Sequence, residues 1–259
     1  NMYMAGFPEN VIEFAKLKKK LKCYLIEDAC HAFGAEYFFK KKFFKVGSSF
    51  HSDICTFSFH PLKSITTGEG GAMTTNNSTF YKKALLFRSH GIERTRNHWN
   101  YQINQPGLNY RLSDINCSLG ISQIEKIKFF LKRRADIVKK YEFLLSSLKE
   151  KKLISFLPKL ISGYSSNHLF ILNINFKKMR LTKNIFFKYL IKNKIMCQYH
   201  YIPIYKFNYF KKLSKKLVNT EKYFNNSISL PIFYELKEAE QVKVVNIIFN
   251  FFKKNENKN

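Results

Sequence analysis

The sequence predicts a mixed α/β fold. Residues 11–20 carry apolar side chains at helical spacing, and short strand-like segments precede and follow them. Strand, helix and strand in that order indicate a parallel crossover within one sheet. A second observation is the β-branched and aromatic stretch Asp53–Phe59, which stops before Pro61. A third is the helical pattern over Ser113–Leu148, which is long enough to bridge two domains.

The remaining elements follow from local signals. Gly6 and Pro8 separate a strand end at residues 1–5 from the first helix, because proline suits the first turn of a helix. Asn77 and Ser78 are good N-cap residues for a helix over 77–89. Further strands are expected at 23–26, 72–75, 168–174, 195–199 and 228–230, with a strand pair in 36–50 that turns at Gly47. Further helices are expected at 181–192 and 237–252, while 91–108 and 201–216 are expected to be loops or irregular. We predict two domains, residues 1–119 and 120–259.

The net charge of +27 would suit a protein that binds nucleic acid or an anionic membrane. The lysines, however, are scattered in short runs such as 18–20 and 40–42, and only seven of the 45 basic residues are Arg. Dedicated phosphate-binding surfaces usually rely on Arg as well. Lys, Phe, Tyr, Ile and Asn all have A/T-rich codons, so genome composition explains the bias. We therefore predict no nucleic-acid partner.

No apolar run approaches the ~20 residues that span a bilayer, and residues 1–5 do not begin a signal peptide. The five cysteines are an odd number without a CxxC pair, and Cys23 and Cys55 fall in predicted core strands. These features predict a cytoplasmic protein with reduced thiols, no membrane association and no metal site.

Lys63 is the residue with the strongest chemical context. Pro61 ends the preceding strand because it has no N–H to donate, so Lys63 lies past the carboxyl end of that strand. Open α/β sheets bind ligands at that edge, and Asp28 lies at the same edge, after an earlier strand. The glycine-rich segment 66–71 lets the backbone pass close to a ligand. A desolvated lysine there acts as a nucleophile toward carbonyl groups.

Three motifs resemble those of the pyridoxal-phosphate-dependent nucleotide-sugar aminotransferases, the DegT/StrS family. They are HPLKSITTGEGG at 60–71, YLIEDACHAFGA at 24–35 and GLNYRL at 107–112. The resemblance implies a fold-type I transferase of the aspartate-aminotransferase kind, with part of a large domain and then a small α/β domain. It also implies pyridoxal 5'-phosphate as cofactor. Because the chain opens on what would be a middle strand, we expect the family's amino-terminal part to be missing or supplied by another polypeptide.

The resemblance also implies roles for five residues. Lys63 would form a Schiff base with the cofactor, and Asp28 would face the pyridine nitrogen and favour its protonated form. His31 would lie near the ring oxygen, where many members of the family carry Gln. Ser58 would donate to the cofactor phosphate. Asn109 would reach the phosphate bound by the neighbouring subunit, which requires a homodimer.

Asp28, Ser58 and His31 also have plain structural interpretations. Asp28 would serve as a helix N-cap in any α/β protein, and Ser58 as a packed strand residue. A lone histidine such as His31 or His168 is more often structural, and we expect that of His168. Arg111 either binds an anion or makes an ion pair at a helix start.

The segments SSNHLF at 165–170 and QYHYIPIY at 198–205 resemble members of the family that act on a UDP-linked 4-keto-6-deoxy-N-acetyl sugar. By that match Gln198, Tyr199, His200 and Tyr201 face the sugar nucleotide. The implied reaction transfers an amino group from glutamate to C4 of the sugar and feeds pseudaminic acid synthesis. Two alternatives stay open. One is an aminotransferase for a GDP- or dTDP-linked 4-keto sugar, and the other is a non-enzyme, either an inactive remnant or a basic binding module.

Overall fold

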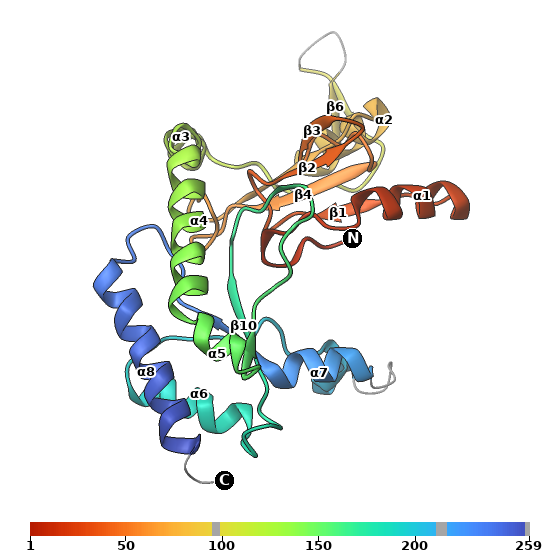
Figure 1. Ribbon diagram of the computed structural model, residues 1–259. Coiled ribbons are helices and arrows are strands. Elements are labelled where there is room, and N and C mark those ends of the chain that lie inside the picture. Colours follow the sequence, from red (N-terminus) through yellow and green to blue (C-terminus); the bar gives the residue numbers. More distant parts are fainter. Residues whose placement is uncertain (95–98, 211–216, 257–259) are drawn as a thin grey trace. The chain divides into compact units, whose positions relative to one another are not determined.

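The computed structural model describes residues 1–94, 99–210 and 217–256 (Figure 1). The chain divides into two compact units. The first comprises Asn1–Leu131 and Leu160–His168, and the second comprises Lys132–Lys159 and Leu169–Asn259. The units change over inside helix α4 (Ile127–Leu144), and the domain boundary predicted after residue 119 stays a prediction.

A three-stranded sheet positions the candidate site in the first unit. It consists of β1 (Ile26–Asp28), β4 (Ile54–Ser58) and β5 (Gly71–Thr74), in the order β1-β4-β5. β1 and β4 run parallel, with Asp28 opposite Thr56, and β5 is antiparallel to β4. Met2 makes a parallel bridge to Asp28 on the other side of β1. A parallel crossover through α1 (Val11–Leu21) is therefore present as predicted, but a single bridge at Met2 takes the place of its first strand.

Two predictions about the opening residues are wrong in detail. The residues after Met2 form a short 3-10 helix, η1 (Met4–Gly6), rather than a strand. β1 begins at Ile26, where the predicted strand was expected to end, and Cys23 is exposed rather than in the core. The described cysteines are all free thiols.

A second sheet in the first unit has the order β3-β2-β9, from β2 (Glu36–Phe39), β3 (Lys42–Lys45) and β9 (Gly163–Tyr164). The strand pair predicted within 36–50 is confirmed, but it turns at Lys40 and Lys41, which take left-handed backbone angles. Side chains from both sheets and α1 form one core, made of Tyr3, Val11, Ala29, Ala32, Ala35, Tyr37, Val46, Cys55 and Phe57.

The middle of the chain differs from the predicted pattern. The residues predicted as a loop at 91–108 include a hairpin of β6 (Ile92–Arg94) and β7 (Tyr101–Ile103), which pairs Ile92 with Ile103. The predicted single helix over 113–148 is three helices: α3 (Asp114–Glu125), α4 and α5 (Ser146–Glu150). The first break occurs at Lys126, whose N–H bonds the Gln123 carbonyl and so tightens the turn. The helix α2 (Ser78–Arg88) is confirmed, with the Asn77 side chain accepting from two N–H groups.

The second unit packs helices on an antiparallel sheet of order β11-β10-β8, from β8 (Ile154–Ser155), β10 (Phe170–Ile174) and β11 (Ser227–Leu230). Its helices include α6 (Lys183–Lys192), α7 (Val218–Asn226) and α8 (Glu238–Glu256), with 3-10 turns η2 (Ile204–Lys206) and η3 (Asn208–Phe210). The fully buried members of its core include Tyr141, Leu145, Leu172, Phe186, Leu190, Ile228, Ile248 and Phe252. The strand predicted at 195–199 is reduced to one bridge between Gln198 and Ser229.

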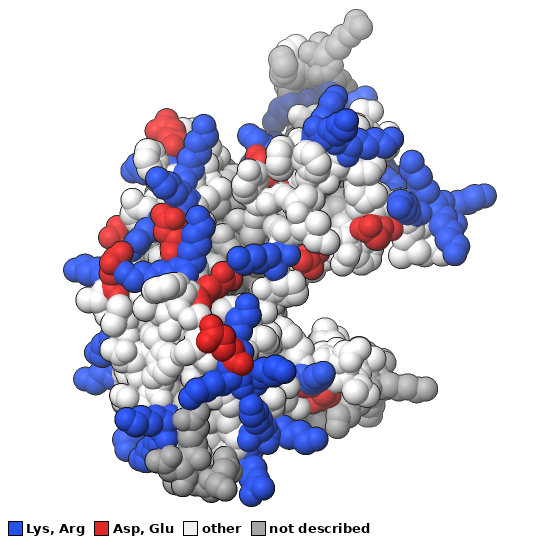
Figure 2. Space-filling model, viewed as in Figure 1, with Lys and Arg blue, Asp and Glu red and all other residues white. Residues whose placement is uncertain are grey.

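The basic residues do not gather in one patch on the face drawn in Figure 2, where Lys and Arg side chains are spread over many elements. Within the described residues, none of the helices is long and apolar enough to cross a membrane.

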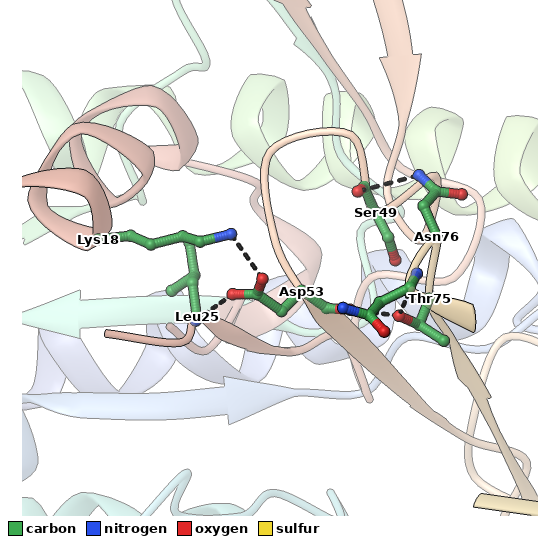
Figure 3. A network of polar contacts seen from close by, with 7 residues as sticks. Lys18, Leu25, Ser49, Asp53, Thr75 and Asn76 are labelled. Carbon is green, nitrogen blue, oxygen red and sulfur yellow. Dashed lines mark hydrogen bonds and ion pairs between the residues drawn. The ribbon is translucent and has the colours of Figure 1, made fainter. Parts of the chain in front are cut away.

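Asp53 ties the start of β4 to its neighbours in the first unit (Figure 3). One carboxylate oxygen accepts from Lys18 Nζ at 2.7 Å, and the other accepts from the Leu25 N–H, also at 2.7 Å. The Asp53 carbonyl accepts from the Thr75 hydroxyl at 2.6 Å. These bonds join α1, the start of β1 and the end of β5, so Asp53 sets the register at one end of the sheet.

We expect Asp53→Ala to lower the free energy of unfolding by about 2 kcal/mol, because it removes two charge-assisted hydrogen bonds. Urea unfolding measures this change. Lys18→Met is the matched control: it removes only a partly exposed ion pair, which is worth at most about 1 kcal/mol. Equal losses in the two variants would contradict the role given to the Leu25 bond.

Candidate active site

The parallel pairing of β1 and β4 brings predicted site residues to one edge of the sheet. Asp28 is the last residue of β1, and Ser58 is the last residue of β4. Lys63 follows β4 after a tight turn in which its N–H donates to the His60 carbonyl at 2.9 Å. The Ser58 hydroxyl oxygen accepts from the His60 N–H at 3.4 Å. Asp28, Ser58 and Lys63 are therefore placed at the same carboxyl edge, where open α/β sheets bind ligands.

Cys30 shows how Asp28 and Lys63 are arranged. The Cys30 N–H donates to Asp28 Oδ1 at 3.1 Å. Burial, and then the hydrogen bond to Asp28 and its negative charge, together raise the pKa of the Cys30 thiol to about 11, while the charge of Lys63 acts in the opposite direction. Carboxylate and ammonium group thus both act on one half-buried thiol. The sequence motif contains Cys30, but nothing in its spacing indicated this contact.

The loop that carries Lys63 is closed by its own hydrogen bonds. The Phe59 carbonyl accepts from the Thr67 N–H at 3.0 Å and from the Thr66 hydroxyl at 3.0 Å. The Phe59 N–H donates to the Gly70 carbonyl at 2.8 Å. Gly70 has a φ of 152°, and a Cβ there would lie 2.5 Å from Thr67 Oγ1. Because Gly70 has no side chain, Thr67 can pack closely against it. This contact and the hydrogen bonds of Phe59 keep the Lys63 loop folded back on the end of β4.

A buried carboxylate lies behind this edge. Glu27 is 3% exposed, and the Tyr3 hydroxyl donates to its Oε1 at 2.5 Å. Burial and the Glu27 charge raise the pKa of Tyr3, and the same two causes raise the pKa of the Cys55 thiol. Alternation along β1 puts Glu27 on the face opposite to Asp28. That alternation is the sequence signal for Glu27, which was not among the predicted site residues.

His31 lies in the interior of the first unit. It is 3% exposed, and its ring centroid is 4.3 Å from that of His168, which is also buried. The Ser166 hydroxyl donates to the His31 carbonyl at 2.5 Å. The buried ring pair accords with the structural interpretation of His168, and a cofactor contact of His31 stays a prediction.

Asn109 is exposed, and its backbone makes an antiparallel bridge to Ser89 next to the hairpin of β6 and β7. The Tyr110 N–H holds the same stretch to the Arg88 carbonyl at 2.9 Å. An exposed side chain on an anchored backbone is what a residue that acts in another subunit needs.

Gln198, Tyr199, His200 and Tyr201, which we call the 198–201 segment, lie in the second unit. Gln198 is exposed, and its backbone exchanges two hydrogen bonds with Ser229. Nδ1 of His200 lies 2.7 Å from Ser229 Oγ, and the His200 carbonyl accepts from the Tyr223 hydroxyl at 2.9 Å. The Ile195 N–H donates to the Leu190 carbonyl at the end of α6, so the start of the predicted strand is bonded to the helix rather than to a β-ladder. Tyr201 is 52% exposed.

The profile of the DegT/DnrJ/EryC1/StrS aminotransferase family matches residues 2–249. The chain belongs to this family. Its sheet of β1, β4 and β5 and its second α/β unit accord with the fold-type I architecture expected from the motifs.

Individual members show the same relation. The chain is 38% identical over 237 residues to the UDP-4-amino-4,6-dideoxy-N-acetyl-beta-L-altrosamine transaminase of Campylobacter jejuni subsp. jejuni serotype O:23/36 (strain 81-176). That match covers 89% of this chain and 60% of the transaminase. The solved structure of Helicobacter pylori PseC, an aminotransferase involved in the biosynthesis of pseudoaminic acid, matches 98% of this chain with a TM-score of 0.88 and 30% identity.

The match covers 66% of the PseC chain. A putative sugar aminotransferase of the family fold, Spr1654 from Streptococcus pneumoniae in its PLP-form, matches 98% of this chain and 67% of its own, with a TM-score of 0.82 and 26% identity. The chain spans 60% of the length of the Campylobacter transaminase, which is less than two thirds. The family match and the likeness of fold nevertheless extend along nearly all of its own residues.

Proposed function

We propose that the chain forms part of a pyridoxal-phosphate-dependent aminotransferase that acts on a nucleotide-linked 4-keto sugar. The observation that carries the proposal is the placement of Asp28, Ser58 and Lys63 at one carboxyl edge of the sheet formed by β1 and β4. Pyridoxal-phosphate chemistry needs a carboxylate and a primary amine at the cofactor, and both groups lie at this edge. The family match supports an aminotransferase role for them.

The donors at this edge fit the cofactor. Pyridoxal phosphate presents an aldehyde, a pyridine nitrogen and a phosphate. Lys63 supplies an amine for the aldehyde, Asp28 a carboxylate for the ring nitrogen, and Ser58 a hydroxyl for the phosphate. The PLP-form of Spr1654 supports this assignment, since it shares the fold. When bound, the cofactor supplies the electron sink for amino transfer.

The chain's own residues then divide the work. Lys63 Nζ acts as nucleophile toward the aldehyde and, once free, as general base and acid that moves a proton to and from C4 of the sugar. Asp28 keeps the pyridine nitrogen protonated, because a carboxylate beside it favours the positive form. Ser58 Oγ orients the phosphate. The hydrogen bonds that fold the loop over Phe59 keep the Lys63 backbone in place during these steps.

The substrate that we propose is a UDP-linked 4-keto-6-deoxy-N-acetyl sugar, with glutamate as amino donor and a precursor of pseudaminic acid as product. The named activity of the Campylobacter relative and the description of PseC support this choice. The 198–201 segment would contact the nucleotide sugar, and His31 the ring oxygen of the cofactor. Asn109 would act across a homodimer.

The test is amino transfer from glutamate by the full-length protein, with UDP-, GDP- and dTDP-linked 4-keto sugars assayed in parallel. Turnover with the UDP sugar alone supports the proposal. Turnover only with a GDP or dTDP sugar would keep the enzyme class and replace the substrate. A protein that binds pyridoxal phosphate without turnover on any sugar would be an inactive remnant, and one that binds none would contradict the proposed function.

Asn109 allows a separate prediction about the dimer. Chains with Lys63→Ala and chains with Asn109→Ala are each expected to be inactive. Mixed heterodimers are expected to regain activity, because one of their two sites has both residues intact. Pure heterodimers should reach about one half of the wild-type activity, and a statistical mixture of the two chains about one quarter. Heterodimers that form and stay inactive would place Asn109 in the same subunit as its site.

A further inference from the structure

Lys183 is buried although it is a lysine on the first turn of a helix. It opens α6 and is 7% exposed. Its Nζ lies 3.5 Å from the ring centroid of Phe224 and 4.0 Å from that of Tyr199. Nζ also donates a hydrogen bond to the Phe224 carbonyl. An ammonium group over aromatic faces is attracted by the ring quadrupoles, and more strongly where water is excluded.

Tyr199, in the 198–201 segment, packs against the core of the second unit. Its ring centroid lies 4.6 Å from that of Phe187 and 5.8 Å from that of Phe224. Its hydroxyl donates to Asn184 Oδ1 at 3.4 Å. On either side of it, the Gln198 side chain and the Tyr201 ring are exposed. The packing of Tyr199 therefore decides how the outward side chains of the segment are presented.

The charged groups around Lys183 make its ammonium costly to keep. Lys206 Nζ lies 4.7 Å from the same Phe224 ring. Burial, and then the charge of Lys206, lower the pKa of Lys183 to about 8. Lys206 itself pairs with Glu221 at 2.8 Å, and Glu221 also accepts from the Tyr205 hydroxyl at 3.0 Å.

The pKa values of the neighbouring thiol and phenol groups are raised, so these groups stay neutral in mildly alkaline solution. Burial raises the pKa of Cys197 to about 12. Burial is also the first cause that raises the pKa of Tyr199, Tyr205 and Tyr223. Nδ1 of the His200 imidazole contacts Ser229 Oγ. Among these groups, Lys183 is the one whose charge changes near pH 8.

We propose that Lys183 is a positioning residue: its ammonium group holds the Tyr199 ring, and through it the 198–201 segment, in the conformation that binds the nucleotide sugar. This inference rests on the proposed function of that segment. Lys183 does not touch the substrate in this scheme. The rings of Tyr199 and Phe224 carry its effect to the exposed side chains of Gln198 and Tyr201.

If Lys183 acts in this way, loss of its proton changes substrate affinity and protein stability in opposite directions. Affinity is expected to fall as pH rises through about 8, because the neutral amine no longer attracts the two rings. Stability responds with the other sign. Between about pH 8 and the unfolded value of 10.5, the unfolded chain binds more protons than the folded one, so this group's contribution to stability increases with pH. A residue that only fills space would change neither quantity with pH.

The experiment measures the affinity of the full-length protein for uridine diphosphate by calorimetry, at about pH 7 and about pH 9.5, beside the melting temperature. The wild type is expected to bind about tenfold more weakly at the higher pH. Lys183→Met is expected to bind about tenfold more weakly than the wild type at pH 7, with only the pH dependence that ionisation of the uracil ring itself gives, and with an equal or higher melting temperature. Lys183→Arg keeps its charge and is expected to bind well at both pH values. Lys188→Met, at an exposed position of the same helix, is the matched control and should behave as the wild type.

Three outcomes would overturn the inference. One is equal affinity of the wild type and Lys183→Met, and another is a wild-type affinity that does not change with pH. The third is a parallel loss of affinity and melting temperature in Lys183→Met, which would indicate packing alone. In each of these cases the wild type still binds uridine diphosphate, so the proposed function stands. A wild type that binds none at either pH would contradict the proposed function and, with it, this inference.

Discussion

Replacing Lys63 by alanine is expected to abolish amino transfer. The loss should reach at least about 10⁴-fold, the upper end of what a single general acid–base contributes, because the same amine also serves as the nucleophile. The variant should keep its fold, since the loop is closed by backbone and threonine hydrogen bonds that do not involve the Lys63 side chain. Turnover of the UDP-linked 4-keto sugar measures the first expectation, and circular dichroism the second.

A covalent test identifies the amine independently of turnover. Borohydride treatment of the wild type with pyridoxal phosphate is expected to attach the cofactor to the Lys63 peptide, as mass spectrometry would show. Lys63→Arg is the matched control, because it keeps the positive charge beside Cys30 but offers no comparable nucleophile. Attachment of the cofactor to another lysine in the wild type would move the site away from this edge.

Replacing Asp28 by asparagine is expected to lower turnover by about 10²-fold or more, at ~1.36 kcal/mol for each factor of ten. The asparagine keeps the shape but removes the charge that holds the pyridine nitrogen in its protonated form. Asp53→Asn makes the same chemical change at the start of the neighbouring strand. It should leave turnover per folded molecule near that of the wild type, since Asp53 bonds Lys18 and the backbone rather than the carboxyl edge.

Asp28→Asn has a second expected effect, which needs no cofactor. Burial is the largest cause that raises the pKa of the Cys30 thiol, and the hydrogen bond to Asp28 and its charge add to it, so their loss should bring that pKa down part of the way from about 11. Cys30 should then react faster with iodoacetamide at about pH 9, where more of it is thiolate. Mass spectrometry of the labelled Cys30 peptide follows the rate. An unchanged rate together with near-normal turnover would contradict the placement of Asp28.

The sequence by itself predicted the parts of the site that depend on short-range patterns. Lys63 follows a strand because Pro61 cannot extend the ladder, and that signal lies within a few residues. The glycine-rich run after it and the motif around Asp28 are equally local, and together they led to the family that the profile confirms. The helices α2, α6 and α8 were predicted for the same reason, since cap residues and apolar periodicity are written in consecutive positions.

Only the tertiary structure decided which distant groups meet. Glu27 and Tyr3 are 24 residues apart, and the crossover through α1 brings them into one buried hydrogen bond. The pairing of Ile92 with Ile103 in the hairpin of β6 and β7 was likewise invisible in a polar stretch. The sequence gives no sign that Lys183 is buried, because helical periodicity does not reveal which distant residues pack against a position at a helix start. Its burial depends on Phe224, which lies 41 residues later, and the free energy of that contact exists only once α6 and α7 have packed together.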